Sequence, residues 1–135
     1  MRIAFFVNDL GKEVAGYTTT ALAIEALKAG HEIWYITPGD FAFDEDDRIA
    51  AHATTVPKRK YESTEALLEG LQGEKARRER ICDDDLDVLM LRNDPSQDFI
   101  ERPWAHNAGI IFGQVAAAHG VIVLNDPFGL SRAMN

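Results

Sequence analysis

Apolar runs and helical patterns alternate along the first third of the chain. Residues 2–7 are an almost continuous apolar run, which is typical of a strand buried on both faces. Residues 20–29 place Leu22, Ile24, Ala26 and Leu27 at helical spacing and stop at Gly30, and residues 31–37 form a second apolar run. This pattern predicts a strand, a helix and a second strand, and therefore a βαβ unit.

The alternation returns in the last third of the chain. Residues 86–91 predict a third parallel strand, and residues 121–124 predict a short, buried fourth strand. Between them we expect a helix that begins near Pro103 and ends near His119, because proline suits a first turn better than a helix interior. Crossover rules then predict an α/β fold. It has a small, mostly parallel sheet in the order second, first, third, fourth, with helices on both faces.

The middle of the chain is more polar and less regular. Two short stretches within residues 41–56 flank an acidic cluster and predict a surface hairpin. Residues 63–71 predict a short helix with Leu67, Leu68 and Leu71 on its apolar face. The charged stretch after Gly73 has no apolar period, so we expect a mobile surface segment there.

Composition narrows the classes of protein and of partner. The 135 residues, 46% of them hydrophobic, are most simply one domain over residues 1–135. A formal net charge of −8 argues against nucleic acid or an anionic membrane as partner, because both need a cationic surface. No stretch approaches the roughly 20 apolar residues of a membrane span. Cys82 is the single cysteine, so no internal disulfide can form, and we expect a cytoplasmic protein.

Polar residues follow the carboxyl ends of all four predicted strands, at Asn8 and Asp9 and in residues 37–40, 92–95 and 125–127. Parallel strands bring these ends to one edge of the sheet, where open α/β sheets bind ligands. Arg92 directly follows a buried strand, a position that packing alone rarely gives to arginine. Its planar, permanently charged donor fork suits a substrate carboxylate or phosphate.

Structural readings of the same residues stay open. Arg92 can instead form an ion pair with Asp94 or Asp9, and Asn125 can cap a following helix rather than touch a ligand. We expect His52 on a half-buried strand, and Trp34 and Tyr35 in packed positions.

Several familiar chemistries are not indicated by the sequence. The loop after the first strand lacks the G-x-G-x-x-G spacing of a dinucleotide site. The four histidines are scattered without ligand spacing, and the acids at positions 83–85 are better read as a solvated approach to a strand than as a metal site. No nucleophile, base and orienting group stand together, so we predict neither a catalytic nor a metal site within this chain.

The chain resembles the amino-terminal domain of prokaryotic glutathione synthetase, a ligase of the ATP-grasp superfamily. The resemblance covers the whole chain and depends on the order and spacing of several motifs: Asn8-Asp9, residues 29–35 leading to Gly39-Asp40, Ala51-His52, Arg92-Asn93-Asp94-Pro95 and Asn125-Asp126-Pro127. It implies a Rossmann-like, three-layer pre-ATP-grasp domain. Relatives often carry Asp-Pro where this chain has Asn8-Asp9, which leaves contacts of that loop open.

For a full-length relative the resemblance implies ATP-dependent ligation of γ-glutamylcysteine to glycine. ATP and Mg²⁺ would be bound by ATP-grasp domains that are absent from this chain, so we expect no cofactor here and no activity of the chain alone. The implied ligand is a peptide-like small molecule, bound by Arg92, Asn93, Asp94, Asp9 and Asn125. A homo-oligomer is compatible with this picture. The alternatives are a stand-alone, non-catalytic binding or interaction module and, less well matched, a flavodoxin-like or receiver-type switch, which would need a lysine after a late strand.

Overall fold

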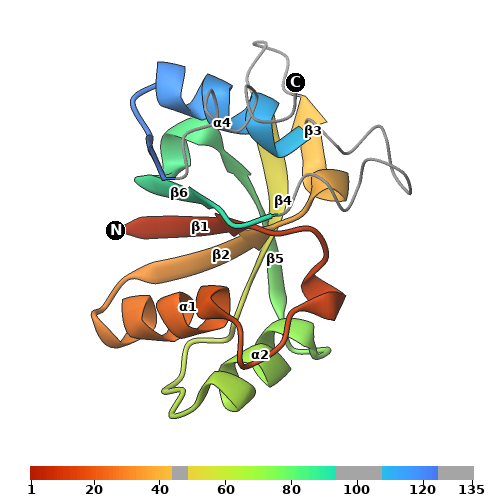
Figure 1. Cartoon of the computed structure of the whole chain (residues 1–135), viewed down its shortest axis with the longest axis vertical. Helices are drawn as coiled ribbons and strands as arrows, with labels where there is room; N and C mark the ends of the chain where they lie inside the picture. Colours follow the sequence, from red (N-terminus) through yellow and green to blue (C-terminus); the bar gives the residue numbers. More distant parts are fainter. Residues whose placement is uncertain (44–48, 94–107, 125–135) are drawn as a thin grey trace.

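The computed structural model describes residues 1–43, 49–93 and 108–124. In these residues seven strands form one sheet, with α1 and α2 on one face and α4 on the other (Figure 1). The strands are β1 (Arg2–Phe6), β2 (Glu32–Ile36), β3 (Phe41–Phe43), β4 (Ile49–Thr55), β5 (Arg77–Cys82), β6 (Val88–Leu91) and β7 (Ile122–Leu124). The helices are α1 (Thr18–Lys28), α2 (Thr64–Gln72) and α4 (Ala108–Ala118), with short 3-10 turns η1 (Leu10–Lys12), η2 (Pro38–Asp40) and η3 (Asp83–Asp85). The α/β class predicted from the sequence is confirmed.

The parallel part of the sheet has the predicted strand order. β1 lies between β2 and β6, with Ala4 beside Trp34 on one side and beside Leu89 on the other. β7 pairs with β6, also in parallel, so the order β2-β1-β6-β7 is confirmed. The three parallel pairings bring the carboxyl ends of β1, β2 and β6 to one edge of the sheet.

An antiparallel extension completes the sheet beyond β2. The hairpin of β3 and β4 is confirmed as an antiparallel pair, but its placement at the surface was wrong. β4 pairs with β5 along one side, and its other side pairs with β3 near its start and with β2 near its end. Ala50, Ala51 and Ala53 of β4 are fully buried. Alanine is a weak strand former, so the sequence pattern understated how deeply this strand lies.

The prediction of a mobile surface segment after Gly73 is wrong, because this charged stretch forms β5. Residues 77–82 pair antiparallel with β4 over six residue pairs, from Thr55 beside Arg77 to Ala50 beside Cys82. Only Ile81 is buried in this strand, while the side chains of residues 77–80 are exposed. Charged side chains are typical of an edge strand because they oppose pairing with another chain.

Two apolar cores lie on the two faces of the sheet. Between the sheet and the helices α1 and α2, buried side chains include Phe5, Tyr35 and Leu67, with the rings of Phe5 and Tyr35 5.4 Å apart. On the other face Phe112 of α4 lies 4.9 Å from Phe41, whose ring stacks on Phe6 at 5.6 Å. Leu67, Leu68 and Leu71 of α2 are buried as predicted, and so are Trp34 and Tyr35.

Some predictions about burial and boundaries need correction. Leu22, expected on the apolar face of α1, is 37% exposed, whereas Ile24 is buried as expected, together with Thr19, Thr20 and Ala23. β7 was expected to be buried, but Ile122 is 59% exposed because this strand is the other edge of the sheet. His52 is exposed rather than half-buried. The predicted start of the last helix near Pro103 lies outside the described residues.

Both predicted glycine stops end their helices. After α1, Gly30 has φ 88°, and His31 N donates to Ala26 O while Gly30 N donates to Leu27 O, which is the Schellman arrangement. Gly120 has φ 90° and closes α4 in the same way. None of the helices in the described ranges has the length and apolar character needed to cross a bilayer.

Candidate functional site

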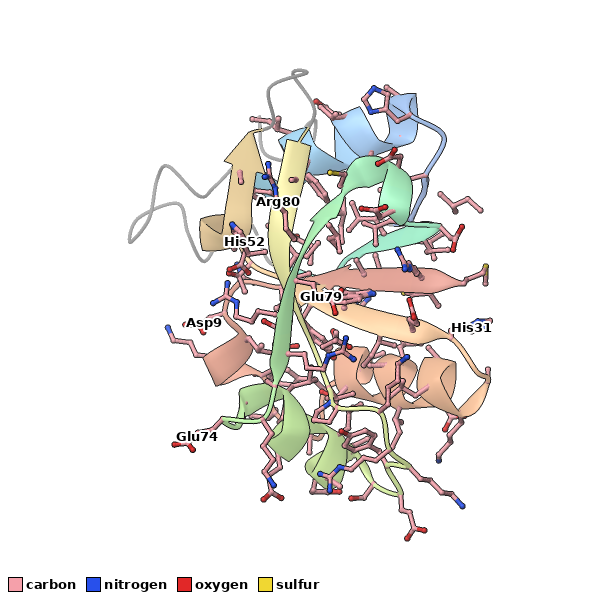
Figure 2. The ribbon with its side chains drawn as sticks, turned by 180° about the vertical axis from the view of Figure 1, so that it is seen from behind. Asp9, His31, His52, Glu74, Glu79 and Arg80 are labelled. Atoms are coloured by element: carbon pink, nitrogen blue, oxygen red, sulfur yellow. The ribbon has the colours of Figure 1, made fainter. Side chains whose placement is uncertain are left out.

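A cleft of about 320 Å³ opens at the carboxyl edge of the parallel strands. It lies where the loop after β1, the start of α1 and the end of β6 meet. Figure 2 shows Asp9 beside the η1 turn at this edge, at the far end of the strands from His31. The residues that line it are Asn8, Asp9, Lys12, Glu13, Tyr17, Thr18, Thr19 and Arg92.

Arg92 is half-buried at the wall of this cleft. Its backbone N–H donates to Phe6 O at 2.9 Å, which continues the β1–β6 ladder and fixes where the side chain begins. Its Nε donates to the Thr19 hydroxyl at 3.3 Å. The terminal guanidinium nitrogens have no hydrogen-bond partner among the described residues, so their donor fork is available to a ligand.

The sequence left open an ion pair between Arg92 and either Asp9 or Asp94. No ion pair joins Arg92 to Asp9 in the part of the chain that the structure describes. Asp94, the other predicted partner, lies outside that part. The Asp9 carboxylate is engaged locally instead: its Oδ1 accepts from Gly11 N at 2.9 Å and caps the η1 turn. Asp9 therefore lines the cleft while shaping the loop that forms it.

The first turn of α1 forms a second wall. Its N-cap residue, Tyr17, makes no side-chain cap, so the backbone N–H groups of Thr18 and Thr19 have no partner within the helix. The Thr20 hydroxyl donates to Val14 O at 2.9 Å, which holds the preceding loop against the helix. No acid lies in this first turn, and the carboxylates that share the cleft with this positive helix end come from the loop before it, at Asp9 and Glu13.

Glu13 adds a carboxylate that the sequence analysis did not single out. Its Oε1 is buried and has no hydrogen-bond partner among the described residues. Burial raises the pKa of Glu13 above 4.5, and the charge of Arg92 opposes this rise. Beneath the cleft, the pKa of the Tyr35 phenol is raised by burial and by the charge of Glu13, against a smaller lowering by Thr20.

Among the residues that the structure describes, the charged side chains that line the cleft are balanced. Lys12 and Arg92 contribute two cations, and Asp9 and Glu13 contribute two carboxylates. A site for a polyphosphate would need an excess of cations. The balance fits a ligand that carries charges of both signs.

Other predicted site residues lie elsewhere. Asn93 is half-buried, its Oδ1 has no partner among the described residues, and it does not line the cleft. Asn125, like Asp94, falls outside the described residues. The loop after β2 does not line the cleft either, because Asp40 accepts from Thr37 N at 2.8 Å and pairs with Arg78 at 2.8 Å. Of the four predicted loops, the structure brings together those that follow β1 and β6.

A second acidic group lies near η3, away from the cleft. Ligand atoms of Cys82, Asp84 and Asp85 lie within 4.8 Å of one another. However, Asp85 Oδ2 already accepts from Cys82 N at 2.8 Å, and Arg2 approaches its other oxygen at 4.0 Å. Exposed acids in such a turn are common without a metal.

Sequence reasoning missed five residues of the cleft: Lys12, Glu13, Tyr17, Thr18 and Thr19. A signal was present, because the loop after the first strand of an α/β sheet and the start of the following helix are the usual place for ligand contacts. Without a glycine-rich fingerprint, nothing in the sequence showed which side chains of that loop turn inward.

The fold and cleft define an α/β domain with a polar cleft at the carboxyl edge of its parallel strands. Comparison with known proteins makes the assignment specific. Residues 1–131 match the family model described as prokaryotic glutathione synthetase, N-terminal domain, and the chain belongs to this family. It is also similar to the glutathione synthetase of Brucella melitensis biotype 1, with 34% identity over 85 residues. That match covers 63% of this chain and 25% of the relative.

Proposed function

We propose that this chain is the substrate-side domain of a glutathione synthetase-like, ATP-dependent ligase and that its cleft binds γ-glutamylcysteine. The family and the curated relative support the ligase class and a role in glutathione biosynthesis. The observation that carries the proposal is the guanidinium of Arg92. It lies in a charge-balanced cleft with its terminal nitrogens unpartnered among the described residues, ready to clamp a carboxylate. The reducing cytoplasm is the expected compartment.

The reaction proposed for the complete enzyme joins two amino-acid units. The cysteinyl carboxylate of γ-glutamylcysteine takes a phosphoryl group from ATP, and the amine of glycine then displaces phosphate to give glutathione, ADP and phosphate. Magnesium and cationic groups would stabilise the transferring phosphoryl group. This chain's residues would bind and orient the peptide, because the described residues that line the cleft carry no excess positive charge to hold a triphosphate.

The experiment uses the 135-residue chain itself. We expect γ-glutamylcysteine to perturb the amide NMR signals of Arg92, Thr19 and their neighbours at millimolar concentration, and ATP with Mg²⁺ to leave these signals unchanged. Given ATP, Mg²⁺, γ-glutamylcysteine and glycine, the chain should release no phosphate above background. Phosphate release dependent on γ-glutamylcysteine would contradict a purely substrate-side role. Binding of neither ligand would favour the alternative of a module with another partner.

A further inference from the structure

Two opposite charges face the same cleft without forming an ion pair. Glu13 comes from the loop after η1, and Arg92 comes from the end of β6. The charge of Arg92 acts on the Glu13 carboxyl, but no ion pair connects them among the described residues. Arg92 is tied to Thr19 instead. Both side chains nevertheless line the same cleft.

The backbone of Glu13 is held firmly enough to set the direction of its side chain. Glu13 N donates to Leu10 O at 3.2 Å, and Glu13 O accepts from Gln72 Nε2 at 3.1 Å. The same Gln72 amide also donates to Leu10 O at 2.8 Å, so α2 anchors the loop. The inward position of the carboxylate is thus a property of the loop.

This position is unfavourable for folding. A buried acceptor with no donor costs free energy, and a carboxylate costs more than a neutral group. A residue with a purely structural role would be expected to pair with the nearby arginine. A buried Oε1 without a hydrogen-bond donor and a guanidinium whose terminal nitrogens have no partner among the described residues belong to the same cleft, which is the arrangement expected where a ligand supplies the missing partners.

The missing partner of Glu13 has a defined chemistry. It must donate hydrogen bonds, and a small group that also carries positive charge complements a carboxylate best, which an ammonium group does. A divalent metal ion is less suitable because Lys12 and Arg92 share the cleft, and because such an ion takes several oxygen ligands. Among the described residues, the group with metal-ligand spacing is the one around Cys82, not this one.

We propose that Glu13 is a specificity residue that binds the free amino group of the γ-glutamyl end of the substrate, while Arg92 binds the α-carboxylate of the same end. The cleft would then recognise an α-amino-acid zwitterion rather than any carboxylate. This inference rests on the proposed function, since it assigns a contact within the same site.

The test compares two ligands and three variants of the 135-residue chain. The ligands are γ-glutamylcysteine and glutarylcysteine, which lacks only the amino group. The variants are Glu13→Gln, Arg92→Ala and a matched control, Glu69→Gln, which changes an exposed acid on α2. Dissociation constants come from NMR titration, and thermal unfolding of each variant checks its fold.

We expect the wild-type chain to bind γ-glutamylcysteine about tenfold more tightly than glutarylcysteine. Glu13→Gln should remove this preference because it weakens binding of γ-glutamylcysteine alone, and it should not lower thermal stability at pH 7. Arg92→Ala should weaken binding of both ligands, and Glu69→Gln should change the dissociation constant of neither.

Equal binding of the two ligands by the wild-type chain would overturn the inference and leave the proposed function standing. The inference would also be overturned if Glu13→Gln weakened binding of both ligands equally and lowered thermal stability, because Glu13 would then act by supporting the fold. If γ-glutamylcysteine and glutarylcysteine both fail to bind the wild-type chain at millimolar concentration, the proposed function fails, and the inference fails with it.

Discussion

Arg92 Nε lies 3.3 Å from the hydroxyl oxygen of Thr19, so a hydrogen bond joins the end of β6 to the first turn of α1 across 73 positions of sequence. This contact orients the guanidinium. Because Nε is engaged, the terminal nitrogens present their N–H groups to the cleft. The bond is long and should be modest in energy, which makes its contribution to positioning measurable by substitution.

Replacing Arg92 tests its role as a carboxylate clamp. Arg92→Ala should weaken binding of γ-glutamylcysteine by roughly 1.5 to 3 kcal/mol, the range of a hydrogen bond to a charged group. Lysine should restore only part of this loss, since a point charge lacks the planar fork. The free energy of unfolding should change by no more than about 1 kcal/mol, because the guanidinium has no ion pair to lose among the described residues.

The control for this substitution is Arg59→Ala, which removes an exposed arginine that stacks on Tyr61 at 4.8 Å, away from the cleft. It should leave ligand binding unchanged. A large loss of stability in Arg92→Ala, with ligand affinity preserved, would show that Arg92 is a structural residue.

The contact between Thr19 and Arg92 can be measured by a double-mutant cycle. Thr19→Val keeps the shape of the side chain and removes the acceptor, so it should weaken γ-glutamylcysteine binding by about 0.5 to 1 kcal/mol. In an Arg92→Ala background the same change should have little further effect, because the group that Thr19 orients is gone. Calorimetric titration of the four proteins gives the coupling energy. Strictly additive losses would mean that Thr19 contacts the ligand independently of Arg92.

Glu13 should make the stability of the domain depend on pH. Burial raises the pKa of Glu13 in the folded chain above 4.5, and the positive charge of Arg92 partly offsets this rise. As pH rises from 4.5 through the raised pKa, the unfolded chain gives up this proton first, so the free energy of unfolding falls. Below pH 4.5 the carboxyl is protonated in both states and the penalty is absent.

Urea denaturation of the wild-type chain and of Glu13→Gln over this pH range measures the effect. The free energy of unfolding of the wild type, relative to the variant, should decrease as pH rises above 4.5. An unchanged difference between the two proteins would show that the Glu13 carboxyl is solvated in the folded chain. An increasing difference would show that it is stabilised by a partner.

The parallel core could be predicted from sequence because its signals are local. Continuous apolar runs such as residues 2–7 mark buried strands, and the crossover rules leave few ways to order them. β5 could not be predicted in this way. Its four charged residues carry no apolar period, and its pairing with β4 depends on a long-range contact that local pattern does not record.

The candidate site was predicted in part for a similar reason. Arg92 stands out because a cation directly follows a buried strand. Glu13 and Thr19 do not stand out, since a glutamate in a polar loop and a threonine at a helix start are ordinary in sequence. Their place in the cleft depends on how α2 anchors the loop through Gln72 and on the orientation of α1, both of which are tertiary effects.

The glycine that ends α1 permits a matched test of backbone strain. Gly30 and Gly39 both have open space where a Cβ would stand, but only Gly30 has a positive φ, of 88°. Gly30→Ala should therefore destabilise the domain by about 1 to 2 kcal/mol, the cost of left-handed backbone for an L-residue. Gly39→Ala should be neutral or stabilising by a few tenths of a kcal/mol, through the entropy of the unfolded chain. Urea denaturation of both variants makes the comparison, and equal losses of stability would show that the conformation after α1 is not what requires glycine there.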